Sequence, residues 1–450
     1  MGRLYKHFSI ITTHQLLVLG YLLVTLAGAV LLSLPISSAQ GQTQRFIDAL
    51  FVAVSGISTT GLTVVDVGSY YNAFGQVVLL CIFQIGGVGY MTFIVFLMSV
   101  LGMRLSLVTA SVAKESLSGT DYRMLGKFFG VVVIFTSVFE LAGAAILTLY
   151  WAREFPLRKA AYLGIFHSIS AFCTAGFSLF PDSLMKYKNS AIVNSTIMVV
   201  SLAGGVGYIV LHDLYIYLSK KLKGTYPRRL LAHTKIVLTV SAAIMLMGTA
   251  ILLTAEKWPP ATPFGERVMV SAFQAVSAST TDGFNTIDIA GMSATCLTFI
   301  VILMFVGASP GGTGGGVKTS TLGLILTFIW LQLRHREANA NMFKREIPVS
   351  TVHKAFGVVL WFALIAAAGV LILSATEKVS YLQVLFETIS ALGNTGLSTG
   401  ITPNLSNIGK ITLTIIMFLG RIGPVAAGFS LVGERKPVLY EYATEDIFVG

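Results

Sequence analysis

The chain has 450 residues, of which 54% are hydrophobic and only 11% are charged, and its mean hydropathy is +0.79. Because soluble domains carry about 25% charged residues, this composition excludes a soluble globular protein and indicates an integral membrane protein. The formal net charge of +11 does not require a nucleic-acid partner, because most Lys and Arg residues fall in segments expected on one side of a membrane, as is typical of cytoplasmic loops.

The predicted elements follow one order in four modules: outer apolar span, short amphipathic segment, glycine motif and inner apolar span. A span needs about 20 apolar residues, whereas an amphipathic helix of about ten residues covers only about 15 Å. The sequence predicts an all-α membrane protein with eight transmembrane helices and four re-entrant pore helices around one pseudo-fourfold pore. The modules are 1–104, 105–222, 223–336 and 337–432, with a C-terminal tail at 433–450. Outer spans are expected near 14–35, 126–150, 233–255 and 353–375, and inner spans begin near 73, 190, 293 and 405.

The amphipathic segment and the glycine motif share one pattern in all four modules. A Phe lies ten residues before a Gly, a Ser lies six residues before the same Gly, and Leu or Phe follows it. Four copies at long intervals indicate duplicated modules. A Gly at one fixed place marks a backbone with unusual dihedral angles or a very close neighbour. The copies are Phe51, Ser55 and Gly61; Phe166, Ser170 and Gly176; Phe273, Ser277 and Gly283; and Phe386, Ser390 and Gly396.

The residues that end at each repeated Gly are candidates for a cation-selectivity filter. Small polar residues after a half-helix leave carbonyls free, and the negative end of the helix dipole points the same way. Four such strands can replace the water shell of a cation with carbonyl oxygens. The alternative, four turns with Gly as a C-cap, is disfavoured by the common register. The candidate residues are Ser58, Thr59, Thr60 and Gly61; Cys173, Thr174, Ala175 and Gly176; Thr280, Thr281, Asp282 and Gly283; and Gly393, Asn394, Thr395 and Gly396.

The inner span of the third module contains an interruption. Residues 292–332 would extend about 60 Å as one helix, which is more than one membrane crossing. Each Gly costs a helix about 1 kcal/mol and each Pro about 3 kcal/mol, so we expect the helix to break into a flexible loop. Lys318 follows at once and needs water or a partner there. The loop residues are Gly307, Ala308, Ser309, Pro310, Gly311, Gly312, Thr313, Gly314, Gly315 and Gly316.

Arg421 lies in the middle of the last inner span, within Phe418-Leu-Gly-Arg-Ile-Gly-Pro424. Because burial of a guanidinium in a membrane is costly, the residue is interpreted as functional, and the alternative is a structural ion pair. Two glycine runs in earlier inner spans, Gly86-Gly87-Val-Gly89 and Gly204-Gly205-Val-Gly207, are interpreted as sites of close helix packing.

Three other polar residues fall in or beside membrane-embedded segments. Glu140 lies in the second outer span and His167 in the second amphipathic segment, and both are interpreted as buried structural hydrogen-bonding groups. Asp282 is adjacent to a filter glycine. It either concentrates cations at the pore or is locked behind the filter by hydrogen bonds, and both interpretations stay open.

The filter repeats, the Gly-rich break at 307–316 and the segment around Arg421 resemble the Trk/Ktr/HKT superfamily of cation transporters. The resemblance covers nearly the whole chain and is nearest to the membrane subunit of the Ktr branch. The eight-span length and a tail that stops soon after Glu445-Asp-Ile-Phe-Val-Gly450 are also similar to that branch.

This resemblance implies a potassium-selective subunit of a Ktr-type potassium uptake system, with sodium as a stimulating ion. In the family, Gly at all four filter positions accompanies potassium selectivity. Residues 307–316 correspond to an intramembrane gate loop, and Arg421 corresponds to an arginine that faces it below the filter. The chain is expected to transport ions and not to be an enzyme.

The family also implies the assembly and location of the chain. Ktr membrane subunits are homodimers that sit on a cytosolic ring of nucleotide-binding RCK subunits. We therefore expect nucleotide only on the partner, no cofactor in this chain, and no metal beyond the transported potassium. The expected location is the cell membrane, multi-pass, with cytoplasmic N- and C-termini. The alternative function is a secondary active cation symporter with a midplane site, but such folds often use inverted repeats, and these four modules keep one order.

Overall fold

The outer helices of the four modules are present close to their predicted positions. The computed structural model describes residues 13–88, 125–225, 229–334, 340–343 and 345–432. Long apolar stretches without Pro form these helices, and α8, α12 and α16 are long and apolar enough to cross a membrane. The predicted tail at 433–450 and the predicted boundary between the first two modules lie outside the described residues. The outer helices are α2 (Thr13–Ser33), α8 (Leu125–Trp151), α12 (Ala232–Ala255) and α16 (Val349–Thr376).

Four half-length helices carry the repeated Phe and Ser residues. They have 12, 16, 17 and 13 residues and begin before the repeated Phe, so the prediction of about ten residues was too short. Pro156 and Pro263 occupy N-cap positions in two of them, and Ser380 forms a capping box with Gln383 in the last. These start signals place the beginnings of α9, α13 and α17 more than a turn before the repeated Phe. The helices are α3 (Phe46–Ile57), α9 (Leu157–Phe172), α13 (Phe264–Thr280) and α17 (Tyr381–Gly393).

The inner segments begin where the sequence predicts, but three of them are not single straight helices. A 102° bend separates α10 from α11 at Gly207, whose φ is 95°. A loop separates α14 from α15, and α18 is kinked at Gly423 with φ 75°. The break in the third module was predicted, whereas continuous inner spans were expected in the second and fourth modules, and this was wrong because Gly readily adopts such dihedral angles. The inner segments are α5 (Ala73–Val88), α10 (Ala191–Val206) with α11 (Tyr208–Leu222), α14 (Ala294–Phe305) with α15 (Thr319–Leu333), and α18 (Asn407–Val432).

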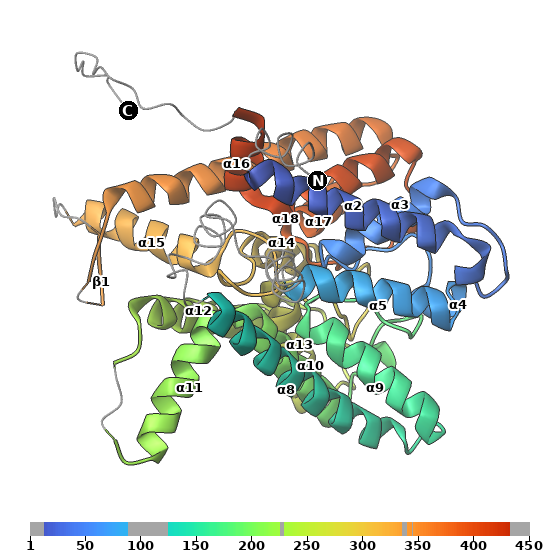
Figure 1. The fold of residues 1–450 in the computed structure, drawn as a ribbon, viewed down its shortest axis with the longest axis horizontal. Coiled ribbons are helices and arrows are strands. Elements are labelled where there is room, and N and C mark those ends of the chain that lie inside the picture. The colour runs from blue at the N-terminus through green and yellow to red at the C-terminus, as the bar shows by residue number, and fades with distance from the viewer. Residues whose placement is uncertain (1–12, 89–124, 226–228, 335–339, 344, 433–450) are drawn as a thin grey trace, which may run out of the picture.

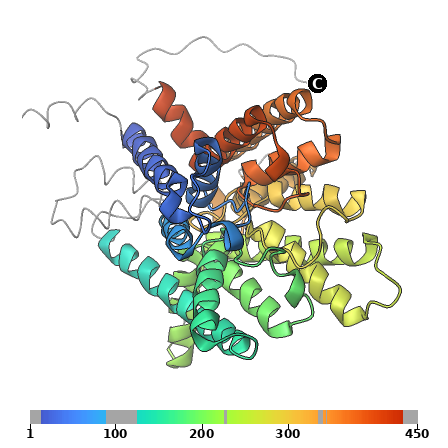
Figure 2. The ribbon, with the colours of Figure 1, turned by 90° about the vertical axis from the view of Figure 1, so that its right-hand side faces the viewer.

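The modules follow one another around a common centre. In Figure 1 and Figure 2 the colours run round that centre, from blue through green and yellow to red. Each outer helix packs on the half-length helix of its own module, as α8 does on α9. Each inner segment packs on the half-length helix of the next module, in the pairs α5 with α9, α10 with α13, α14 with α17 and α18 with α3. The last pair joins the end of the chain to its beginning and closes the circle.

The centre of the molecule is built from the repeated aromatic residues. The repeated Phe residues of all four half-length helices are at most 1% exposed: Phe51, Phe166, Phe273 and Phe386. In contrast, the outer helices expose large apolar side chains such as Leu141, Leu246 and Leu371. An apolar exterior around a buried aromatic centre is expected for helices that face lipid.

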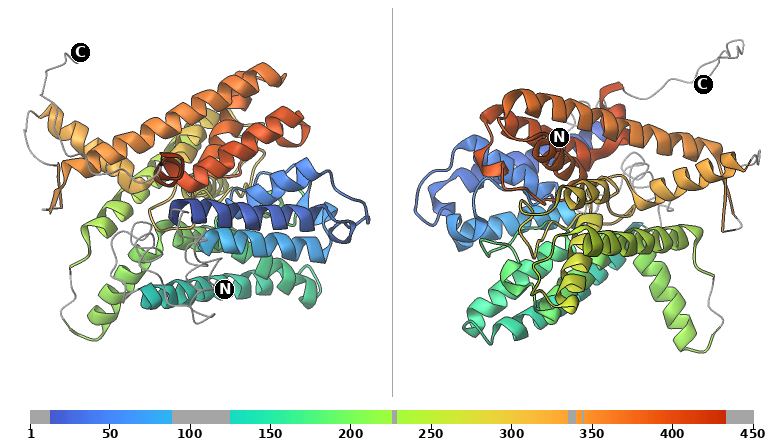
Figure 3. Two further views of the ribbon diagram at one scale, coloured as in Figure 1. Left: turned by 45° about the horizontal axis from the view of Figure 1, so that its top comes forward. Right: turned by 180° about the vertical axis from the view of Figure 1, so that it is seen from behind.

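Short elements connect the helices of this all-α fold, and one of them is a small hairpin that was not predicted. Strands β1 (Ala340–Met342) and β2 (Arg345–Ile347) form an antiparallel hairpin between α15 and α16, with Ala340 opposite Ile347. Figure 3 shows α11 standing away from the other helices. The remaining short helices are η1 (Pro35–Ser37), α4 (Val67–Tyr70), η3 (Met185–Tyr187) and η4 (Thr402–Asn404).

Candidate functional site

The four strands that follow the half-length helices share one backbone conformation. The residue two before each repeated Gly has φ between 49° and 58°, and the Gly itself has φ between 66° and 92°. The residue that closes the helix in the left-handed conformation is therefore Thr or Asn, and the repeated Gly comes two residues later. This geometry does not match four simple turns with Gly as the C-cap. The left-handed residues are Thr59, Thr174, Thr281 and Asn394.

The repeated Ser holds each strand to its helix through its backbone. Its carbonyl accepts the N–H of the residue just before the repeated Gly in all four copies. The donor–acceptor pairs are Thr60 to Ser55 and Ala175 to Ser170 at 2.8 Å, and Asp282 to Ser277 and Thr395 to Ser390 at 2.9 Å. One bond repeated in four copies shows that the spacing found in the sequence fixes one backbone turn.

The four repeated glycines form a closed ring. Each repeated Gly lies against a carbonyl oxygen of the next strand, which belongs to the residue just before that strand's own repeated Gly. If the first Gly carried a Cβ, that atom would fall 2.5 Å or less from this oxygen. The contacts run from Gly61 to Ala175, from Gly176 to Asp282, from Gly283 to Thr395 and from Gly396 to Thr60. Only Gly allows such an approach, so four backbones surround one axis.

This ring has the chemistry of a site for a cation. The C-terminal ends of α3, α9, α13 and α17 all lead into it, and helix C-termini carry partial negative charge. Backbone carbonyls in a ring can replace the hydration shell of a cation. Among the described residues, no group of three or more His, Cys, Asp or Glu side chains could hold a metal ion.

The Gly-rich segment at 307–316 lies directly against the strands of this ring. Thr59 Oγ1 donates to the Thr313 carbonyl at 3.3 Å, and Thr174 Oγ1 donates to Thr313 Oγ1 at 3.2 Å. Gly315 N–H donates to Thr281 Oγ1 at 3.0 Å. A Cβ on Gly315 would lie 2.6 Å from Asn394 Oδ1. The loop therefore contacts the left-handed residue of every strand, through Thr313 and Gly315.

The loop is also hydrogen-bonded to the junction between α10 and α11. Ser309 and Thr313 donate their N–H groups to the carbonyls of Gly205 and Gly204, at 2.9 and 3.0 Å. Tyr208 N–H donates to the Gly311 carbonyl at 3.1 Å. The loop that was expected to be flexible makes these bonds because the lack of side chains lets its backbone reach neighbouring backbones. The second glycine run contacts this loop in addition to allowing helix packing.

Two cationic side chains hold the carbonyls of the loop. Arg421 Nη1 donates to the Thr313 carbonyl at 2.5 Å, and Arg421 Nη2 donates to the Gly86 carbonyl. Lys318 Nζ donates to the Gly314 carbonyl at 2.6 Å and to the Gly315 carbonyl at 3.3 Å. Arg421 thus joins the loop to α5, and its fork of donors suits two carbonyl acceptors.

The other predicted polar residues lie behind the ring. Gln84 Nε2 donates to Glu140 at 2.9 Å, and the Cys173 thiol donates to Gln84 Oε1 at 3.2 Å, so Glu140 connects to the second strand. His167 is fully buried and bonds within its own module. Asp282 is 1% exposed, and no donor among the described residues is hydrogen-bonded to its carboxyl.

Sequence reasoning missed a buried ion pair between the first and last modules. Lys410 Nζ of α18 lies 2.7 Å from Asp48 Oδ1 of α3, and the two side chains are 10% and 15% exposed. A charged residue in an apolar span needs a partner, so Lys410 gave a signal in the sequence. The pairing itself was not predictable, because 362 residues separate the two positions.

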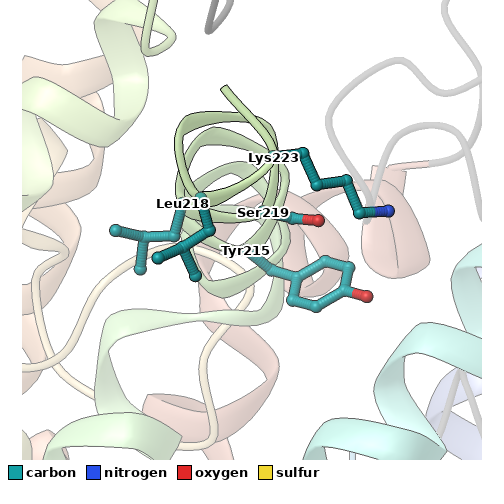
Figure 4. Close-up of a pocket in the computed structure, with 5 residues that line it drawn as sticks. Tyr215, Leu218, Ser219 and Lys223 are labelled. Atoms are coloured by element: carbon teal, nitrogen blue, oxygen red, sulfur yellow. The ribbon is translucent and has the colours of Figure 1, made fainter. Parts of the chain in front are cut away.

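One surface pocket lies apart from the ring. Four of its lining residues belong to α11 and the fifth, Lys223, follows the helix directly, as Figure 4 shows. Because no polar groups from other elements converge there, it lacks the features of a ligand site. The lining residues are Tyr215, Leu218, Ser219, Leu222 and Lys223.

Comparison with known proteins gives one consistent result. The chain matches the TrkH family, described as a cation transport protein, over residues 22–431. It is 36% identical to the Ktr system potassium uptake protein B of Vibrio alginolyticus, over 97% of this chain and 94% of that protein. The protein of the same name from Bacillus subtilis is 34% identical, over 98% and 97% of the two chains. Potassium/sodium uptake protein NtpJ of Enterococcus hirae is 31% identical, over 97% of each.

A solved structure shares the fold. The crystal structure of the potassium transporter TrkH from Vibrio parahaemolyticus superposes with a TM-score of 0.69, over 92% of this chain and 85% of that one. The sequence identity between the two chains is 21%.

Proposed function

The chain belongs to the TrkH family of cation transport proteins, and from this premise we propose that it is the potassium-selective membrane subunit of a Ktr-type potassium uptake system. The observation that carries the proposal is the closed ring of Gly61, Gly176, Gly283 and Gly396. Four backbones at one axis can offer carbonyl oxygens to a dehydrated cation. The potassium uptake proteins among its relatives support potassium as the ion, and the relative that is a potassium/sodium uptake protein supports a role for sodium, which we propose is that of a stimulating ion.

The proposal includes one pseudo-fourfold pore built by four modules, each with an outer helix, a pore helix and an inner segment. The order of helix packing around the centre supports it, since each inner segment packs on the pore helix of the next module. This parallel order also favours a pore over a secondary active symporter with a midplane site, because inverted repeats would reverse the packing order.

The loop at 307–316 is proposed as the gate below the filter, with Arg421 as its latch. Its contacts with all four left-handed filter residues support this role, because a loop in that position obstructs the axis. Arg421 adds a positive charge beside the loop, which opposes the passage of a cation.

We also propose the assembly implied by the Ktr relatives. The chain would form a homodimer in the cell membrane with its termini in the cytoplasm and would bind a cytosolic ring of RCK subunits that carries the nucleotide. The concentration of Lys and Arg in the inter-module segments supports this orientation.

The test is ion uptake in a cell that lacks its own potassium uptake systems. We expect the chain to support uptake of potassium in preference to sodium, and uptake to increase when a nucleotide-binding ring subunit is expressed with it. Equal uptake of the two ions by membrane-inserted protein would contradict the proposed selectivity. Uptake that requires a fixed ratio of a second ion would favour the symporter.

A further inference from the structure

The residue that follows the repeated Phe occupies an equivalent place in all four pore helices. It lies nine residues before the filter Gly, and it is fully buried in every copy. Three copies have a polar side chain there, and one copy has an apolar side chain. The four residues are Val52, His167, Gln274 and Glu387.

The three polar side chains reach the same part of their own strand. His167 Nε2 lies 3.1 Å from Ser178 Oγ and accepts the N–H of Leu179 at 3.3 Å. Gln274 Nε2 donates to Thr286 Oγ1 at 3.4 Å. These partners come two or three residues after the filter Gly, where the strand leaves the filter.

Glu387 makes the largest number of these contacts. Its Oε1 accepts hydrogen bonds from Ser398 Oγ at 2.7 Å, Thr399 N at 2.8 Å and Thr399 Oγ1 at 3.1 Å. Its Oε2 accepts a hydrogen bond from Thr402 Oγ1 at 2.8 Å. Four donors on one buried carboxyl fix the course of the strand beyond Gly396, because leaving buried polar groups without partners is costly.

The first copy lacks this arrangement. Val52 has no polar atom in its side chain, and Ser55 Oγ has no hydrogen-bond partner among the described residues. In the other copies the corresponding Ser hydroxyl does bond to the strand, as Ser277 Oγ does to the Phe284 carbonyl at 2.6 Å. Three strands are therefore bonded to these two side chains of their own pore helix, whereas the first strand is bonded to its pore helix through backbone carbonyls alone, such as that of Ser55.

We infer that the residue nine positions before the filter Gly is a positioning residue for ion selectivity, and that Glu387 is the dominant one. Selectivity depends on the spacing and number of carbonyl oxygens around the ion. A strand that is fixed on both sides of its Gly holds those oxygens in place, whereas a loose strand adapts to a smaller ion. The inference rests on the proposed potassium selectivity.

The test compares potassium and sodium uptake by membrane-inserted variants. Glu387→Val installs the side chain found in the first copy, and we expect it to lower the ratio of potassium to sodium uptake by about tenfold, as loss of one or more charge-assisted hydrogen bonds predicts. Glu387→Gln keeps one carbonyl oxygen for the three donors now on Oε1, and its amide N–H can donate to Thr402 Oγ1, so it should retain most of the ratio.

The matched control is Glu377→Gln. Glu377 accepts hydrogen bonds from Ser406 Oγ at 2.5 Å and Ser406 N at 3.1 Å, at the junction of α16 and α18 and not behind the filter. Its variant should keep the parental ratio. Thr402→Val removes a single donor to Glu387 without changing the carboxyl, and it should lower the ratio by about threefold.

The outcomes separate the inference from the proposed function. If membrane-inserted Glu387→Val keeps the parental ratio of potassium to sodium uptake, the inference is overturned. It is also overturned if Glu377→Gln lowers this ratio as much as Glu387→Val does. If Glu387→Val does not insert, an unchanged ratio in Thr402→Val overturns it instead. If the parent chain itself takes up both ions equally, the proposed function fails.

Discussion

Replacement of Arg421 by Ala tests whether the loop below the filter is a gate. In the structure the guanidinium donates to the Thr313 carbonyl of the loop at 2.5 Å and to the Gly86 carbonyl of α5. Ala at this position leaves both carbonyls without that donor and removes a positive charge from beside the loop. Both changes act in one direction: they favour an open loop and lower the barrier to a cation.

The expected magnitude follows from the contacts that are lost and those that remain. Each hydrogen bond to a charged group contributes about 1.5–3 kcal/mol, and water replaces part of it when the loop opens. The bonds from Ser309, Thr313 and Lys318 to the loop or its surroundings are retained. We therefore expect a net shift of about 1.5 kcal/mol toward the open loop, which is about a tenfold rise in the open-to-closed ratio.

The assay is potassium uptake at several external concentrations, normalised to membrane-inserted protein. Arg421→Ala should raise the maximal rate and leave the ratio of potassium to sodium uptake unchanged, because the filter contacts remain. Arg267→Ala is a suitable control, since Arg267 also donates to a backbone carbonyl, that of Thr262 at 2.9 Å, but at the far end of α13. A maximal rate at or below that of the parent would refute the latch and leave Arg421 as a structural residue.

Three further predictions concern the filter, the loop and the partner surface. Gly283→Ser should lower the potassium-to-sodium uptake ratio, because φ is 87° there and the new Cβ would strike the Thr395 carbonyl; the same ratio in the variant would contradict the filter. Deletion within 311–316 should raise potassium flux, and a folded deletion with lower flux would argue against an obstruction. Charge reversal in the basic segments 220–229 and 334–354, parts of which lie outside the described residues, should weaken co-purification with an RCK ring, whereas full co-purification would place the contact elsewhere.

The positions of the helices could be predicted because apolar length alone determines them. The inner segments were expected near 73, 190, 293 and 405, and they begin at Ala73, Ala191, Ala294 and Asn407. The bend at Gly207 and the kink at Gly423 were not predicted, since a Gly permits many backbone directions and specifies none of them. The hairpin at 340–347 was missed because two three-residue strands carry almost no periodic signal.

In the candidate site, too, some features could be predicted from the sequence and others could not. The spacing of Phe, Ser and Gly identified the four strands, because each copy repeats one local turn. The contacts of the loop were not predictable, since its bonds to Gly204, Gly205 and Tyr208 join backbone groups, which look alike in any sequence. The residues with left-handed backbone conformation lie within the predicted filter segments. Their contact with the loop at 307–316 was not predicted, because it depends on the closure of the whole ring.

That closure also explains why the left-handed residue of the fourth strand is Asn and not Thr. Asn394 Nδ2 donates to Thr60 Oγ1 of the first strand at 3.0 Å and to the Met417 carbonyl of α18 at 2.9 Å. A Thr hydroxyl has one hydrogen to donate and cannot serve both acceptors, whereas an amide has two.

The first strand is the one whose pore helix provides no side-chain bond from Val52 or Ser55. It is held instead by its neighbour, through Asn394, and by the bond between Ser58 Oγ and Thr60 Oγ1 at 2.6 Å. The four strands therefore reach one ring geometry by two routes: side chains of their own pore helices support three of them, and the first has in their place a side-chain contact from the strand that closes the circle. Since Asn394 bonds directly to Thr60, a change at Asn394 should loosen the first strand as well as its own.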